Sequence, residues 1–248
     1  MHLVHLFILF LVGAIAGFIN VNAGGGSSLT LPMLIFLGLE GSLANGTNRV
    51  AIFIQNIFAV SSFRRQGVHE FKKSFTLGLL TLPGAVIGAL VASRISDLLF
   101  QRILAIVLIL IVISILFSRS YQNNSQKMGR PAHPFLYPAL VAVGFYGGFL
   151  QIGVGFLFMA TLYHLLRVDL IRVNMHKVFI ILLYTLPALI VFSLTGNVNW
   201  GYGLILAAGN ALGAWWGARA AVKGGERIIK IILAVAILIM SFKLLKVF

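Results

Sequence analysis

Apolar residues along this chain gather into two sets of five segments, separated by short polar or glycine-rich stretches. A helix needs about 20 apolar residues to cross the hydrocarbon core of a bilayer, so the longer segments predict membrane-spanning helices. The second segment of each set is much shorter, which predicts a half-helix, a re-entrant arm or a strongly tilted span. The segments are residues 3–22, 27–39, 44–62, 74–93 and 101–118, and then 135–152, 155–166, 177–194, 201–219 and 228–246.

The composition indicates an all-α polytopic membrane protein with the lipid bilayer as its partner. Hydrophobic residues make up 60% of the 248 positions and charged residues only 10%, which is more apolar surface than a soluble domain needs. The net charge of +14 would suggest nucleic acid in a soluble chain. Here the basic residues lie between apolar segments and form no continuous face, so no nucleic-acid binding is expected. The chain has no cysteine, so no disulfide or thiolate metal site is expected.

The two sets of segments indicate an internal duplication. They match without a gap at one constant offset, the one that places Gly24 on Gly153, and glycine falls on glycine more often than chance would give. We therefore expect a first transmembrane repeat over residues 1–118, a linker over 119–134 and a second repeat over 135–248. The aligned pairs are Gly24/Gly153, Gly26/Gly155, Gly67/Gly196, Gly84/Gly213, Gly88/Gly217 and Asn45/Asn174.

Charge indicates that the two repeats are inverted. The loop 63–73 carries a net +3, whereas its counterpart at 194–200 carries no charge. Because Lys and Arg collect in cytoplasmic loops, equivalent loops of different charge point to opposite orientations in the membrane. We expect a multi-pass protein of the inner (plasma) membrane with both termini outside. The basic loops expected in the cytoplasm are 63–73, 119–134, 167–177 and 219–230.

Small residues recur at every fourth position in two segments, at Gly84 and Gly88 and at Gly209, Gly213 and Gly217. This spacing lets helix backbones approach closely. We interpret both stripes as packing surfaces rather than as substrate contacts.

A glycine run, Gly24-Gly-Gly26, separates the first two apolar segments. Glycine destabilises a lipid-facing helix, and free backbone amides need partners, so such a run is tolerated where the chain breaks to line a polar cavity. The next helix is then expected to begin at Ser27–Leu29. Its N-terminus, the positive end of the helix dipole, would point at an anion in that cavity.

A second polar stretch, Ala44-Asn-Gly-Thr-Asn-Arg49, opens the third segment. A glycine run, a later proline, Ala-x-Gly-Thr-Asn and an Arg-Arg-x-Gly loop (here Arg64-Arg-Gln-Gly67) together resemble the sulfite exporter TauE/SafE family of membrane permeases. The resemblance covers essentially the whole chain when the duplication is counted. The second half departs from the pattern, because it reads Gln151-Ile-Gly-Val-Gly155 and Met175-His-Lys177 at the equivalent places.

The resemblance implies transport of small sulfur-containing anions, such as sulfite or an organosulfonate, often out of the cell. Inverted repeats would bring the two breaks together near the midplane, where each offers backbone N–H groups to an oxyanion during alternating access. An anion-selective channel built from the same half-helix N-termini is the alternative. A structural or assembly subunit is a third possibility.

The predicted site joins the two breaks to the polar residues that open the third segment of each repeat. Lys177 and His176 would charge the second repeat, while Thr47 and Asn48 leave the first one neutral, so the anion is expected closer to the second repeat. Alternatively, Lys177 and Arg49 snorkel to the membrane surface, and His176 is a packing residue. The predicted substrate-binding residues are Asn22, Gly24, Gly25, Gly26, Ser27, Ser28, Asn45, Thr47, Asn48, Arg49, Gln151, Gly153, Gly155, Asn174, His176 and Lys177.

No enzymatic activity is expected from this sequence. It contains no paired-carboxylate site, metal-ligand cluster or nucleophile elbow, so no catalytic residue, metal or cofactor is predicted. Its five acidic residues all lie in or beside loops, which leaves no intramembrane carboxylate for a proton relay. We therefore expect uncoupled export in which the membrane potential acts on an anion, and any proton coupling would have to rest on His176 or on the protonation state of the substrate.

Overall fold

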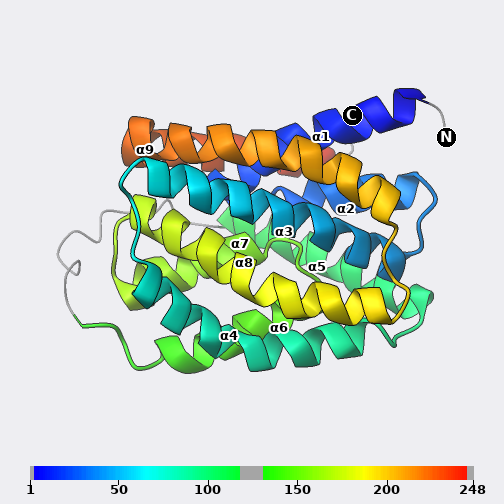
Figure 1. Ribbon diagram of the computed structural model, residues 1–248, viewed down its shortest axis with the longest axis horizontal. Helices are drawn as coiled ribbons and strands as arrows, with labels where there is room; N and C mark the ends of the chain where they lie inside the picture. Colours follow the sequence, from blue (N-terminus) through cyan, green and yellow to red (C-terminus); the bar gives the residue numbers. More distant parts are fainter. Residues whose placement is uncertain (1–2, 118–130, 245–248) are drawn as a thin grey trace.

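The computed structural model describes residues 3–117 and 131–244, except for the side chains of 108, 110–117 and 225–244. Throughout these ranges the regular elements are helices, which lie alongside one another in an elongated bundle (Figure 1). The first half contains α1 (Leu3–Asn22), α2 (Ser27–Phe36), α3 (Gly41–Arg65), α4 (Phe71–Ala92) and α5 (Asp97–Phe117). The second contains α6 (Leu136–Phe149), α7 (Val154–Thr161), a π-helical turn η2 (Leu162–Leu166), α8 (Leu170–Leu194) and α9 (Trp200–Leu244).

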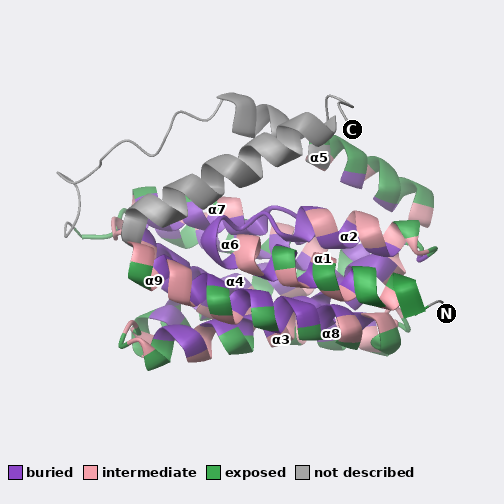
Figure 2. Cartoon of the chain, turned by 90° about the horizontal axis from the view of Figure 1, so that it is seen from above, coloured by how far each residue is buried: buried purple, intermediate pink, exposed green. Residues whose placement is uncertain are grey.

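The distribution of polar and apolar side chains is that of a protein in lipid. Large apolar residues such as Phe36 and Leu194 are about four-fifths exposed, whereas Asn45, Arg49 and Lys177 have almost no exposed surface. Exposed residues lie on the outer faces of the helices and buried ones face inward (Figure 2). Helices α1, α4 and α8 are each long and apolar enough to cross a membrane. An all-helical polytopic membrane protein is therefore confirmed.

The backbone conformation recurs at the offset seen in the sequence. Helices α3 and α8 begin at positions related by that offset, Gly41 and Leu170, and so do α4 and α9, at Phe71 and Trp200. Residues with positive φ recur in the same way, as Gly24/Gly153, Gly38/Arg167 and Gly67/Gly196. Each half thus places its breaks and turns at equivalent positions.

The glycine stripes are packing surfaces, as predicted. Helix α6 packs on α4, and α1 packs on α9. A Cβ atom on Gly88 would overlap the carbonyl oxygen of Phe145, and one on Gly213 would overlap that of Ala14. The backbones of each pair therefore touch, which only glycine permits at these positions.

The bundle has two ends. At the first end, the start of α3 contacts the start of α5, because the Gly41 N–H donates to Asp97. The start of α3 also contacts the start of α9, because the Asn199 N–H donates to Thr47. At the second end, the residues that lead into α6 meet the end of η2, since the His133 N–H donates to the carbonyl of Leu165. Helices α4 and α8 also begin at this second end.

Each short helix leads back to the end of the bundle at which the preceding helix starts. Helix α1 runs from the first end in parallel with α9, with Gly13 beside Leu206 and Gly17 beside Asn210. Only residues 37–40 separate α2 from the start of α3, so α2 must lead back to the first end. Helix α6 and the α7–η2 segment form the equivalent hairpin from the second end. The short segments are therefore re-entrant arms.

The central helices α3 and α8 run antiparallel to each other. The guanidinium of Arg49, near the start of α3, lies 4.6 Å from the ring centroid of Phe192, near the end of α8. Gly46 likewise faces Asn197, which follows α8. Equivalent helices of the two halves thus point in opposite directions.

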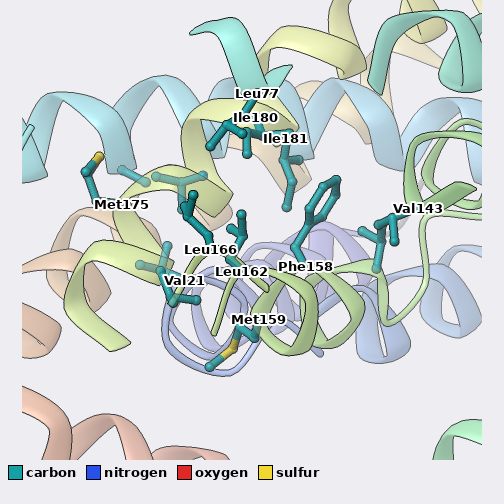
Figure 3. Close-up of a cluster of buried hydrophobic side chains, with 14 of the residues drawn as sticks. Val21, Leu77, Val143, Phe158, Met159, Leu162, Leu166, Met175, Ile180 and Ile181 are labelled. Atoms are coloured by element: carbon teal, nitrogen blue, oxygen red, sulfur yellow. The ribbon is translucent and has the colours of Figure 1, made fainter. Parts of the chain in front are cut away.

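The largest apolar cluster holds the second hairpin against the rest of the bundle. Phe158, Leu162 and Leu166 of α7–η2 gather with Ile181 of α8 and with Val21 from the end of α1 (Figure 3). The end of α1 is therefore packed among residues of the second half.

Two of the four predicted basic loops are wrong, because the structure shows most or all of their residues in helices. Most of 167–177 forms the first two turns of α8, because Asp169 caps the helix by accepting from the Arg172 N–H at 2.9 Å. Residues 219–230 lie inside α9, where Ala, Arg, Lys and Glu favour helix. The loop within 63–73 is limited to residues 66–70. Of the linker 119–134, residues 119–130 lie outside the described residues.

Helix α9 has 45 residues, and Figure 1 shows its later part turning back toward the side on which the helix starts. A straight helix of this length would be roughly twice as long as a bilayer core is thick. The Gly224-Gly225 pair is the local sequence feature that favours a bend.

Candidate functional site

The two chain breaks meet inside the bundle. Gly24 and Gly155 are in backbone contact, because a Cβ atom on Gly155 would overlap the Cα of Gly24. Gly24 and Gly153 both adopt positive φ, at 85° and 67°, and both are buried. The sequence predicts that the breaks face each other, and the structure brings them into contact with no room for a side chain between Gly24 and Gly155.

Side chains near the first break satisfy the freed backbone groups. The Asn20 Oδ1 accepts from the Gly26 N–H at 3.2 Å, and the Ser28 hydroxyl donates to the Gly25 carbonyl at 2.7 Å. Asn22 ends α1 and donates to the carbonyl of Gly217 at 3.1 Å. Its own Oδ1 is buried without a hydrogen-bond partner.

Arg49 closes the end of α6. Its side chain is fully buried and donates to the carbonyls of Gly147 (3.1 Å) and Gly148 and to the Oε1 of Gln151 (2.9 Å). The last carbonyls of a helix have no partner within the helix and carry the negative end of its dipole. A guanidinium satisfies several of them at once because its donors form a planar fork.

Lys177 closes the end of α1 in the equivalent way. Its fully buried ammonium donates to the carbonyl of Val21 at 2.8 Å and to the Oδ1 of Asn174 at 2.7 Å. The interpretation that Lys177 or Arg49 snorkels to the membrane surface is therefore wrong. The premise that the first repeat is neutral is wrong too, because Arg49 contributes a buried cation from that repeat.

The two halves exchange these helix caps. Asn45 of the first half donates to the carbonyl of Phe149 at 2.8 Å, and the equivalent Asn174 donates to the carbonyl of Asn22 at 3.4 Å. Each half thus supplies one cation and one amide to the broken helix of the other half. We call this arrangement, made by Asn45 and Arg49 and by Asn174 and Lys177, the exchanged caps.

Two predicted site residues face away from the breaks. Thr47 accepts from the Asn199 N–H ahead of α9 at 2.9 Å. Its equivalent, His176, pairs through Nδ1 with the Ser74 hydroxyl at 2.8 Å, and its Nε2 lies 3.7 Å from the Glu70 carboxylate. The structure therefore groups Thr47 and His176 with the ends of the bundle. The cause is helical geometry: an α-helix turns by about 100° per residue, so Thr47 and His176 occupy a different face from Arg49 and Lys177.

Several polar residues of the interior are absent from the predicted site. The Thr30 hydroxyl of α2 donates to the Oδ1 of Asn48 at 2.7 Å, which ties the first re-entrant arm to α3. Gln55 accepts from Asn20 at 3.1 Å and from Asn210 at 3.2 Å, which joins α1, α3 and α9. Their signal in the sequence is a polar side chain in the middle of an apolar segment, where lipid contact is unfavourable.

The described residues contain no group of three or more His, Asp or Glu side chains that could hold a metal ion. What the site does offer is a set of buried donors. Its cations are stabilised by backbone and side-chain amide oxygens, and Arg49 also by the ring of Phe192, but the ion pairs among the described residues include neither Arg49 nor Lys177. Such a centre suits an anion.

Paired re-entrant arms, broken helices that meet inside the bundle and a lipid-facing apolar exterior define an integral membrane protein with the architecture of a transporter. Comparison with known proteins gives the family. The model of the sulfite exporter TauE/SafE family matches residues 9–244. The chain therefore belongs to the TauE/SafE family, and it is a membrane transporter rather than an enzyme.

Curated relatives cover nearly the full chain. A probable membrane transporter protein, ORF9, of Sinorhizobium sp is 30% identical over 239 residues, which are 96% of this chain and 91% of the relative. The probable membrane transporter protein YfcA of Escherichia coli K12 is 29% identical, over 96% of this chain and 88% of the relative. YjnA of Bacillus subtilis, another probable membrane transporter protein, is 28% identical, over 94% and 96% respectively. No solved structure matches the chain significantly.

Proposed function

We propose that this protein exports small sulfur-containing anions, such as sulfite or an organosulfonate, across the inner membrane by alternating access around the exchanged caps. The observation that carries the proposal is the pair of buried cations, Arg49 and Lys177, which face helix carbonyls and no carboxylate among the described residues. A buried charge without a counter-charge is costly, and an anion entering between the halves would supply one. The family description supports a sulfur oxyanion as that ligand.

Two features support a carrier over the alternative of an open anion channel. The backbones of Gly24 and Gly155 touch, so the two breaks are closed against each other at this point in this conformation. The equivalent helices α3 and α8 run antiparallel, which supports inverted repeats and therefore two related conformations that open to opposite sides.

The direction of transport follows from charge in this proposal. The membrane potential is negative inside, so it drives an anion outward without a coupled ion. The buried polar side chains of the described residues include no Asp or Glu. Glu70, which contacts His176 at the second end, has a side chain that is one-third exposed. No proton relay through the centre is needed.

Flux measurements test this function. Purified protein in proteoliposomes should transport sulfite or a related anion with saturable kinetics under an imposed potential, whereas unitary currents would show a channel. Sulfite, sulfate, thiosulfate and sulfoacetate would be compared with zwitterionic taurine. Arg49→Gln and Lys177→Gln should each reduce anion flux, and Arg94→Gln, an exposed residue at the first end, serves as the control.

The proposal fails if none of the sulfur anions is transported or raises the unfolding temperature of the purified protein. It also fails if the two buried-cation variants insert and fold normally and retain full flux. An assembly role would then be favoured, and recovery of partner proteins with the variants would become the relevant measurement.

A further inference from the structure

Two guanidinium groups share one indole ring at the second end of the bundle. The guanidinium of Arg65, the last residue of α3, lies 5.0 Å from the ring centroid of Trp215, and that of Arg219 lies 5.1 Å from the same centroid. Arg219 also lies 5.2 Å from the centroid of Trp216. Both cations therefore lie against the same indole ring. The Ser62 hydroxyl donates to the Trp215 carbonyl at 3.0 Å and holds α3 against α9 here.

The described side chains provide no acid for these two cations. The ion pairs among them join Lys73, Arg172 and His176 to Glu70 or Asp169, and none includes Arg65 or Arg219. Stacking on an indole lowers the energy of one cation but does not remove the repulsion between two. An anion bound by both guanidinium groups would offset this repulsion. Guanidinium groups match the oxygen geometry of a phosphate, which they bind with paired hydrogen bonds.

The surroundings of this pair are those of the membrane interface. Trp216 is 59% exposed, and Leu212, one helical turn earlier on the same face, is 51% exposed. Exposed tryptophan beside basic residues is typical of the level at which lipid headgroups lie. The apolar surface next to the two arginines can therefore receive acyl chains, which inorganic phosphate does not have.

We propose that Arg65, Arg219, Trp215 and Trp216 form a binding site for the phosphate of an anionic phospholipid, whose acyl chains lie along Leu212 and Trp216. The lipid bridges the end of α3 and the middle of α9, two elements that pack against each other (Figure 1). This site is separate from the exchanged caps, whose cations are fully buried. It does not depend on which anion the protein transports.

Thermal unfolding in detergent tests the site on the whole protein. Phosphatidylglycerol should raise the unfolding temperature, because a ligand that binds the folded state stabilises it. Neutral phosphatidylcholine and inorganic phosphate should not. The rise should be lost in the double variant Arg65→Gln/Arg219→Gln and kept in the control Arg94→Gln/Arg102→Gln, which removes two exposed arginines near the first end.

Fluorescence gives a second reading that does not depend on stability. The chain has three tryptophans, so Trp200→Phe leaves Trp215 and Trp216 as reporters. Phosphatidylglycerol with brominated acyl chains should quench them more than brominated phosphatidylcholine, and the preference should disappear in the arginine double variant. If that variant does not fold, Arg65→Lys/Arg219→Lys keeps the charge and should weaken the preference, since an ammonium lacks the planar fork.

Several results would overturn the proposal. These are equal stabilisation by the two phospholipids, equal stabilisation by inorganic phosphate, an unchanged lipid effect in the Arg65/Arg219 variants, or loss of the effect in the Arg94/Arg102 control. Unchanged sulfite flux in the Arg65/Arg219 variant would leave the transport function standing, so the two proposals can be separated.

Discussion

At the scale of single residues, the exchanged caps use two different cations, Arg49 and Lys177, for the same role of capping a broken helix. Arg49 reaches two carbonyls and a side-chain amide oxygen, whereas Lys177 reaches one carbonyl and one amide oxygen. The guanidinium has a fixed fork and the ammonium is a compact point charge, so the two are not interchangeable. The end of α6 is therefore held by more bonds than the end of α1.

Replacing Arg49 by Lys should destabilise the protein although it preserves charge. The shorter ammonium cannot reach Gly147, Gly148 and Gln151 together, and loss of charge-assisted hydrogen bonds in a buried site costs about 2 kcal/mol or more. Chemical unfolding in detergent would measure the loss. The matched change Arg64→Lys, at an exposed position, should have little effect. Equal stability of the two variants would contradict the capping role of Arg49.

Adding one methyl group at Gly155 should disturb the meeting of the breaks. The Cβ of alanine would overlap the Cα of Gly24, so the backbone must shift. Overpacking of this kind costs about 1–3 kcal/mol, and flux should fall with it. Gly201→Ala is the control, because its Cβ meets nothing closer than 3.5 Å. Normal flux and unfolding temperature in Gly155→Ala would show that the contact is dispensable.

At the scale of elements, the two ends of the bundle are closed by equivalent contacts of different chemistry. The first end uses the neutral pair Thr47 and Asn199, and the second uses His176 with Ser74 and Glu70. A proton can therefore alter closure at the second end and has no equivalent target in the Thr47–Asn199 contact at the first.

Acid on the second side should increase opening there. His176 is fully buried, and the charged groups around it are two acids, Glu70 and Asp169, and two bases, Lys73 and Arg172. The acids stabilise the protonated imidazole and the bases destabilise it, so these effects oppose each other. The cost of burying a charged imidazole then decides the outcome, and protonation favours conformations in which the ring reaches water. Sulfate flux, measured while pH is lowered on that side alone, should rise.

The same experiment on two histidine variants identifies the group. His176→Gln should remove this response, while His69→Gln, at an exposed position of the same end, should retain it. Sulfate is the suitable substrate because its own charge does not change in this pH range. A response that persists in His176→Gln would place the sensitive group elsewhere.

Much of the element structure can be predicted from the sequence, for identifiable reasons. Apolar length gives the helices, and the glycine run with its second copy at Gly153 and Gly155 gives the breaks and their meeting, since duplication relates them. The starts of α3 and α8 are missed because polar residues interrupt the first two turns of each helix, and the cap at Asp169 is a weak signal.

The direction in which a buried side chain points is harder to predict. Residues 174–177 look like one cluster in the sequence. In the helix, Asn174 and Lys177 lie on one face, toward the broken helix, and His176 lies on another, toward the second end. The exchange of caps between halves cannot be predicted without knowing which helices are neighbours. The roles of Thr30 and Gln55 depend in the same way on tertiary contacts.

At the scale of the whole molecule, the charge pattern predicts that the second end lies in the cytoplasm. The chain has no cysteine, so single cysteines can be added without other changes. In intact cells, an impermeant maleimide should label Gly201→Cys at the first end, and should label His69→Cys at the second end only after permeabilisation. The reverse pattern would invert the orientation, and labelling of both in intact cells would contradict a transmembrane bundle with these two ends.

The exchanged caps also make each half dependent on the other for its own integrity. A half expressed alone would keep a broken helix whose terminal carbonyls lack these partners and a buried cation that has lost its backbone acceptors in the other half, both of which are costly in lipid. Separate halves should therefore be degraded singly and rescued when produced together. The same dependence applies to an ancestor with a single repeat. That ancestor would complete its caps only by pairing with a second copy inserted in the opposite direction. A population that inserts in both orientations is therefore the simplest starting point for this architecture.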